Sequence, residues 1–217
     1  MKKDFDFKFN RLFSALLTRL FMRSSLTPNQ ITVLSLVCGL GAGALFSTGR
    51  YEEGVWGALL YCLACILDNC DGEIARAKNM GSVFGGWLDI AVDFLTDFAL
   101  FGGLALGASK TGDAFFSVKL FFILCLSGGA MHFLLVIIEK LKGFGPAAFS
   151  VPNPDQQSRS NFLFRIFDAL REGEASWLIL GFAIAGKTHY LLWFGGFYMQ
   201  ILWISALFMN FKFLVKK

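Results

Sequence analysis

The sequence predicts an all-α integral membrane protein with six transmembrane helices and an N-terminal amphipathic juxtamembrane helix. Two observations support this fold class: the composition, and the arrangement of apolar residues along the chain. Of the 217 residues, 55% are hydrophobic and 17% are charged, whereas a soluble globular domain has about 25% charged residues. The mean hydropathy of +0.58 excludes a disordered chain, and a soluble monomer could not hide so much apolar surface.

Six apolar stretches follow one another, with short polar links between them. A helix needs about 20 apolar residues to cross a bilayer, so the chain has room for six spans. The stretches comprise residues 30–47, 54–67, 83–106, 114–138, 175–185 and 190–211. The second stretch is long enough only if its helix continues through residues 68–76, which are charged. We expect one domain over residues 1–217, with an interfacial helix over 1–24 and a six-helix membrane bundle over 26–213.

Residues 1–24 show the spacing of an amphipathic helix. Apolar side chains recur at i, i+3 and i+4, with Lys8, Arg11, Arg19 and Arg23 between them. The pattern is typical of a helix in the cytoplasmic membrane interface whose Phe and Leu side chains enter the acyl boundary. A helix packed on the cytoplasmic face of the protein itself would show the same pattern, so both interpretations stay open.

The first span has a clear start. Thr27 is suited to the N-cap, and Pro28 follows at the first helical position. Within this span, Gly39 and Gly43 lie four residues apart and would allow a second helix to approach closely.

The distribution of positive charge predicts the topology. With a cytoplasmic N-terminus, the inner segments carry 16 Lys and Arg residues and the outer segments carry only four. The outer four are Arg50, Lys110, Lys119 and Lys187. The positive-inside rule therefore places both termini in the cytoplasm, in agreement with an even number of spans. We expect a multi-pass protein of a bacterial inner membrane, with no nucleic-acid partner.

Acidic residues form two helical stripes near the predicted cytoplasmic ends of the second and third spans. The first stripe comprises Asp68, Asp71, Gly72, Ala75 and Arg76, and the second comprises Gly85, Asp89 and Asp93, with Asp97 one turn further. The carboxylates should therefore face one another across two antiparallel helices joined by a short turn. Each glycine taken alone could serve helix packing, but intramembrane ionisable groups together indicate a functional site.

These carboxylates require neutralisation. An Asp at the centre of a membrane helix costs about 2.5–3.5 kcal/mol, and Arg76 is the only cation on the two stripes. Oxygen ligands select hard divalent ions, so we expect two Mg²⁺ or Mn²⁺ ions. Paired ions can stabilise an in-line phosphoryl displacement, and Arg76 suits phosphate oxygens.

The segment from Asp68 to Asp93 resembles the signature of the CDP-alcohol phosphotransferases, integral-membrane enzymes of phospholipid synthesis. It has the complete pattern D-x2-D-G-x2-A-R-x8-G-x3-D-x3-D. The resemblance covers residues 24–108 and is only architectural beyond them. It implies transfer of the phosphoalcohol group of a CDP-alcohol to an alcohol acceptor, with release of CMP. It also implies the family's habit of forming homodimers.

The resemblance further implies a role for each residue of the signature. Asp68, Asp71, Asp89 and Asp93 would bind the metal ions, and Asp93 would also act as the base toward the acceptor hydroxyl. The other implied residues line the cytidine pocket or contact the donor diphosphate. The pocket residues would be Gly72, Ala75 and Gly85, and the diphosphate residues Arg76 and Asn29.

The acceptor is less well defined by the sequence. Asp97 could tune the base Asp93 or contact a polyol acceptor, and its spacing resembles that of the branch that transfers onto inositol phosphate. Alternatively, a buried Asp97 could pair with a Ser, His or Trp. In that branch an Arg is expected where this chain has Phe94. Lys140 and Arg159 are candidate contacts for an acceptor phosphate, or simply part of the positive-inside bias. His132 is expected to be a hydrogen-bonded core residue.

Two functions of other classes compete with the enzyme. A divalent-cation transporter would also need buried carboxylates, and a non-catalytic membrane protein would leave their spacing unexplained.

Overall fold

The structure is a computed structural model that describes residues 9–111, 115–143 and 175–215, and every element in these ranges is helical. The helices are α1 (Phe9–Phe21), α2 (Pro28–Phe46), α3 (Tyr51–Ala77), α4 (Val83–Lys110), α5 (Phe115–Gly143), α8 (Ala175–Ile184) and α9 (Tyr190–Val215). The all-helical class is therefore confirmed for the described residues.

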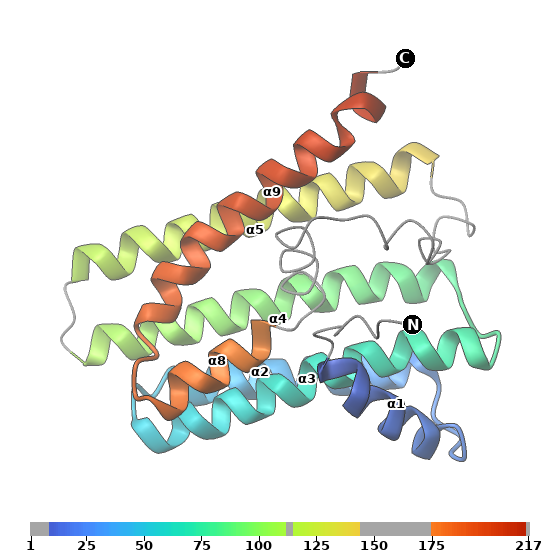
Figure 1. The fold of residues 1–217 in the computed structure, drawn as a ribbon, viewed down its shortest axis with the longest axis horizontal. Helices are drawn as coiled ribbons and strands as arrows, with labels where there is room; N and C mark the ends of the chain where they lie inside the picture. Colours follow the sequence, from blue (N-terminus) through green and yellow to red (C-terminus); the bar gives the residue numbers. More distant parts are fainter. Residues whose placement is uncertain (1–8, 112–114, 144–174, 216–217) are drawn as a thin grey trace, which may run out of the picture.

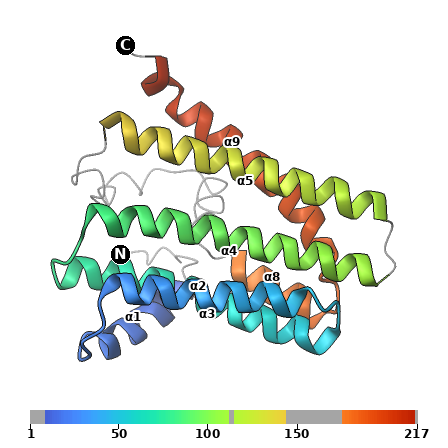
Figure 2. The same cartoon turned by 180° about the vertical axis from the view of Figure 1, so that it is seen from behind.

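The helices form two groups that meet at α4. On one side, α2 packs against both α3 and α4, and α3 also contacts α1 and α8. On the other side, α5 and α9 form a crossed pair, and both contact α4. Figures 1 and 2, which view the molecule from opposite sides, show this pair inclined away from the other helices. A cavity lies between the two groups and is lined by residues of both.

Three described helices are long and apolar enough to cross a membrane: Pro28–Phe46, Val83–Lys110 and Val118–Ile138. The helix that carries the first acidic stripe is continuous from Tyr51 to Ala77, as the length of its apolar part required. The predicted count of six spans goes beyond these three helices and stays a prediction.

The N-terminus of α2 forms as the sequence predicted. The Thr27 side chain accepts a hydrogen bond from the backbone of Gln30, whose side chain accepts one from the Thr27 backbone. Pro28 occupies the first turn. This capping box satisfies two backbone donors reciprocally and fixes where the helix starts.

Small residues bring α2 and α4 into direct backbone contact. A Cβ atom added to Gly103 would overlap the carbonyl oxygen of Gly43, and one on Gly107 would overlap that of Phe46. A Cβ on Gly39 would lie 2.6 Å from the Thr96 side chain. The predicted close approach at Gly39 and Gly43 is therefore confirmed, and its partner is α4. We call this contact the glycine seam.

Helix α1 docks on the protein through its polar face. Ser14 and Thr18 donate hydrogen bonds to the two carboxylate oxygens of Glu73, at 2.8 and 2.7 Å. The opposite face is exposed, with Leu12 at 70% and Leu16 at 66%. The sequence left open whether α1 packs on the protein or exposes its apolar face to lipid, and the structure combines docking with an exposed apolar face.

Candidate active site

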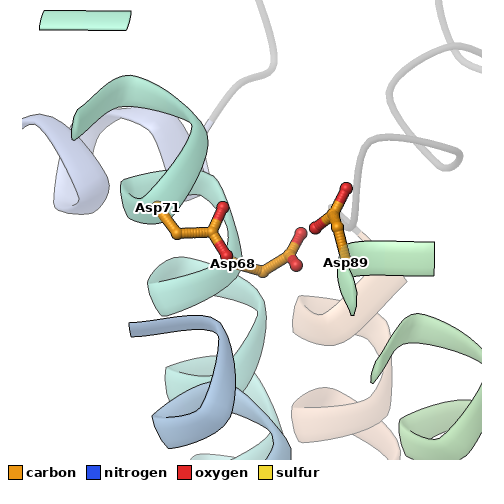
Figure 3. Close-up of side chains that lie close together, drawn as sticks. All are labelled: Asp68, Asp71 and Asp89. Carbon is orange, nitrogen blue, oxygen red and sulfur yellow. The ribbon is translucent and has the colours of Figure 1, made fainter. Parts of the chain in front are cut away.

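Three carboxylates converge between α3 and α4. Ligand oxygens of Asp68, Asp71 and Asp89 lie within 4.8 Å of one another. Figure 3 shows Asp68 and Asp71 on α3 directed toward Asp89 on α4. The two helices run antiparallel around a short link, as predicted, but each packs mainly on α2. Their carboxylates consequently face a space between the helices.

Asp93 extends the cluster by one turn along α4. Its carboxyl group is close enough to that of Asp68 to form a hydrogen bond, and it is exposed to the cavity between the helices. The Oδ1 atom of Asp68 is buried and accepts no hydrogen bond from any described donor. Two carboxylates in contact, one with an orphaned oxygen, require a cation or a shared proton.

The hydroxyl of Thr32 on α2 contacts the acidic cluster. It donates a short hydrogen bond to Oδ2 of Asp71, and the two side chains are buried, at 3% and 6% exposure. Hydrogen bonds of this kind orient the carboxylates that bind metals. Because Thr32 lies 39 residues before Asp71, nothing in the local sequence indicated this contact.

The donor set fits hard divalent ions. All candidate ligands are carboxylate oxygens, and their combined negative charge exceeds what the neighbouring cationic side chains can neutralise. Glu73 stands within the signature but binds α1 through both of its oxygens. It is therefore a structural residue of the α1 interface, which the sequence did not reveal.

The residues assigned to the nucleotide lie at the same end of the helices. A Cβ on Gly72 would meet only the Arg76 side chain, at 3.4 Å or more, while one on Gly85 would lie 2.8 Å from Oδ1 of Asn29. Ala75 is half-buried, and Arg76 is exposed. No described helix packs on Gly72, so helix packing does not explain the glycine at this position.

Asp97 lies deeper along α4, where the hydroxyl of Tyr61 donates a hydrogen bond to its Oδ1 at 3.3 Å. A pairing with Ser, His or Trp was one alternative that the sequence left open, and the partner in the structure is Tyr61 instead. Tyr61 lies 36 residues from Asp97, and only the tertiary arrangement of α3 and α4 brings the two together.

A cavity of about 430 Å³ extends along Asp68, Asp93 and Asp97. Its polar lining includes Arg11, Tyr61, Asp68, Asp93, Asp97 and His132. Phe94 also lines it and stacks on Phe133 with ring centroids 4.7 Å apart. Of the predicted acceptor contacts, the side chain of Lys140 and the whole of Arg159 lie outside the described residues.

Comparisons with known proteins give a consistent result. The family model for CDP-alcohol phosphatidyltransferases matches residues 25–150. The chain is 28% identical over 148 residues to the archaetidylinositol phosphate synthase of Pyrococcus horikoshii, covering 68% of this chain and 73% of that protein. It is 35% identical over 97 residues to the phosphatidylinositol phosphate synthase of Corynebacterium glutamicum, covering 44% and 43%. The chain thus spans less than half the length of many curated relatives that it matches.

Solved structures share the fold. The phosphatidylinositol phosphate synthase of Mycobacterium tuberculosis with manganese and citrate aligns with a TM-score of 0.57 at 19% identity, covering 90% of this chain and 88% of that one. The same enzyme with CDP-DAG bound also gives 0.57, at 20% identity, covering 91% and 94%. Together with the three apolar helices, these relationships identify an integral membrane protein.

Proposed function

The chain belongs to the CDP-alcohol phosphatidyltransferase family, and we propose that it transfers the phosphatidyl group of a CDP-alcohol to an alcohol acceptor with release of CMP. The observation that carries the proposal is the convergence of Asp68, Asp71 and Asp89, whose oxygens lie within 4.8 Å of one another. This convergence lies within the region that the family model matches, and a Cβ on the adjoining Gly72 would meet only the Arg76 side chain.

We assign the metal ligands to four aspartates. Asp68, Asp71 and Asp89 would hold the ions, and Asp93 would complete the site; two Mg²⁺ or Mn²⁺ ions would match the negative charge. The bound ions would supply charge neutralisation for the diphosphate oxygens of the donor. Manganese in the structurally similar enzyme supports this assignment.

The residues of the chain would perform the rest of the reaction by positioning. Arg76 and Asn29 would hold the donor diphosphate, and the small side chains of Gly72, Ala75 and Gly85 would admit the cytidine. The acceptor oxygen would form a bond to the phosphorus nearer the donor's alcohol group. The bond from that phosphorus to the CMP oxygen would break, and the hydroxyl proton would pass to Asp93.

A phosphate-bearing polyol is the acceptor that we favour. Relatives named archaetidylinositol phosphate synthase and phosphatidylinositol phosphate synthase support it. The Tyr61–Asp97 pair also supports it, since both side chains line the cavity next to Asp93 and suit polyol hydroxyls. Phe94, where an Arg was expected in this branch, stacks on Phe133 instead. A cation for the phosphate must therefore come from another position.

The arrangement in the membrane also belongs to the proposal. We propose one domain of six spans, with both termini and the acidic cluster on the cytoplasmic side of a bacterial inner membrane. The exposed apolar face of α1, which includes Leu12 and Leu16, would enter the acyl boundary. A homodimer is consistent with the family resemblance.

The proposal is tested with the full chain in lipid nanodiscs. CDP-diacylglycerol is combined with inositol phosphate, glycerol phosphate, serine, inositol or phosphatidylglycerol, and released CMP is measured. We expect release with one acceptor class only, and only when Mg²⁺ or Mn²⁺ is present. No CMP with any acceptor, or CMP release that persists after chelation, would contradict the proposal. Uptake of divalent ions into proteoliposomes would instead support the transporter.

A further inference from the structure

We propose that Arg11, on α1, binds the phosphate group of a phosphate-bearing alcohol acceptor in the cavity of the acidic cluster. This inference rests on the proposed transferase function and adds a specificity-determining residue to it. The inference is based on the position of a residue that lies outside the signature. A residue of the N-terminal helix lines the same cavity as Asp68 and Asp93.

Hydrogen bonds fix α1 on both sides of Arg11. The preceding residue, Asn10, is fully buried; its side chain donates to Oγ of Ser176 at 3.3 Å and accepts from Nε1 of Trp177 at 2.9 Å. One turn later, Ser14 is held by Glu73. These contacts fix the helical backbone at Arg11, so less conformational entropy is lost there when a ligand binds.

The register of α1 on α3 places Arg11 beside the acidic cluster. The Sγ atom of Cys70 donates to the carbonyl of Ser14 at 3.5 Å, and Nζ of Lys78 donates to the carbonyl of Phe21 at 3.5 Å. The contacts follow the same order along both helices, so α1 and α3 run in the same direction here. One turn before the Ser14–Cys70 contact, Arg11 comes level with the turn of α3 that leads to Asp68.

Charge complementarity identifies the ligand. Among the described residues that line the cavity, Arg11 is the only Lys or Arg, whereas Asp68, Asp93 and Asp97 supply carboxylates. A phosphate-bearing acceptor that enters next to these carboxylates needs a fixed cation. The guanidinium group binds phosphate oxygens through paired N–H donors. Arg11 would thus supply the positive charge for the phosphate that is missing at Phe94, where an Arg was expected.

The test compares Arg11→Ala, Arg11→Lys and Arg19→Ala in nanodiscs. Arg19 is exposed on the same helix and does not line the cavity, so its variant controls for surface charge. The KM for the preferred phosphate-bearing acceptor and the KM for CDP-diacylglycerol are measured separately. For Arg11→Ala we expect the acceptor KM to rise about 10- to 100-fold with the donor KM changed less than twofold. Arg11→Lys should recover part of the loss, and Arg19→Ala should match the wild type.

Several results would overturn the role of Arg11 while leaving the transferase intact. These are an unchanged acceptor KM in Arg11→Ala, an equal rise in the donor KM, or the same loss in Arg19→Ala. A wild-type enzyme that uses only unphosphorylated acceptors would also refute it. Failure of the transferase itself is recognised separately, because the wild type would then release no CMP. Thermal unfolding of each variant shows whether a loss of activity reflects a loss of folded protein.

Discussion

Helix α4 has two contrasting faces. Toward α2, Gly103 and Gly107 leave no room for a side chain and bring backbone against backbone. Toward α3, Asp93 lines a cavity, and Asp89 converges with Asp68 and Asp71 in the acidic cluster. The glycine seam fixes the position of α4, so that the acidic face can stay open without the helix collapsing onto α3. Stability and chemistry are thus separated onto two sides of one helix.

Replacement of the base on the open face should have the largest effect. Asp93→Asn keeps the size of the side chain and removes its ability to accept the acceptor proton. Loss of a general base lowers the rate by about 10²- to 10⁴-fold, and we expect a fall of this size in CMP release with thermal stability nearly unchanged. Glu52→Gln, at the exposed start of α3, is the control. Turnover close to that of the wild type in Asp93→Asn would refute the assigned mechanism.

Removal of the hydrogen bond from Thr32 tests whether the acidic cluster binds metal. Thr32→Val removes the donor to Asp71 and keeps the shape of the side chain. Loss of an outer-shell partner weakens metal binding by about 10- to 100-fold. We expect the Mg²⁺ concentration for half-maximal CMP release to rise by this factor. Thr32→Ser keeps the hydroxyl and should restore most of the affinity. An unchanged Mg²⁺ requirement in Thr32→Val would show that Asp71 is not a ligand.

The glycine seam offers a matched pair of variants for the closed face. Gly103→Ala would force a methyl group against the backbone of Gly43, whereas Gly102→Ala meets nothing within 4 Å. Overpacking of this kind costs about 1–3 kcal/mol. Both variants gain the same helix propensity, so we expect the free energy of unfolding of Gly103→Ala to lie below that of Gly102→Ala by that amount. Equal stabilities, measured by denaturant titration in detergent, would mean that the seam does not hold the two helices.

Much of this organisation could be predicted from the sequence because it depends on local spacing. The Thr27 cap needs only four consecutive residues, and the acidic stripes need only the helical repeat. The match of the family model to residues 25–150 confirms the resemblance that those stripes suggested. Helix periodicity also predicted that Asp68 and Asp71 would face Asp89.

The remaining features depend on contacts between residues distant in sequence. Thr32 approaches Asp71, and Tyr61 approaches Asp97, only after three helices have packed. Arg11 carried no signal beyond a positive charge in an amphipathic segment. The pattern of that segment could not show that its polar face would dock on Glu73. Such contacts follow from tertiary packing, which periodicity does not specify.

The smallest effect is expected for Gly72→Ala, which distinguishes a glycine beside the acidic cluster from those of the glycine seam. Gly72 lies beside the acidic cluster, and a Cβ there would touch only the flexible Arg76 side chain. Because Ala is favoured over Gly in a helix by about 1 kcal/mol, Gly72→Ala should unfold no more easily than the wild type. Its methyl group would narrow the space assigned to cytidine, so the KM for CDP-diacylglycerol should rise several-fold. A loss of stability like that of Gly103→Ala would instead mean that Gly72 serves packing.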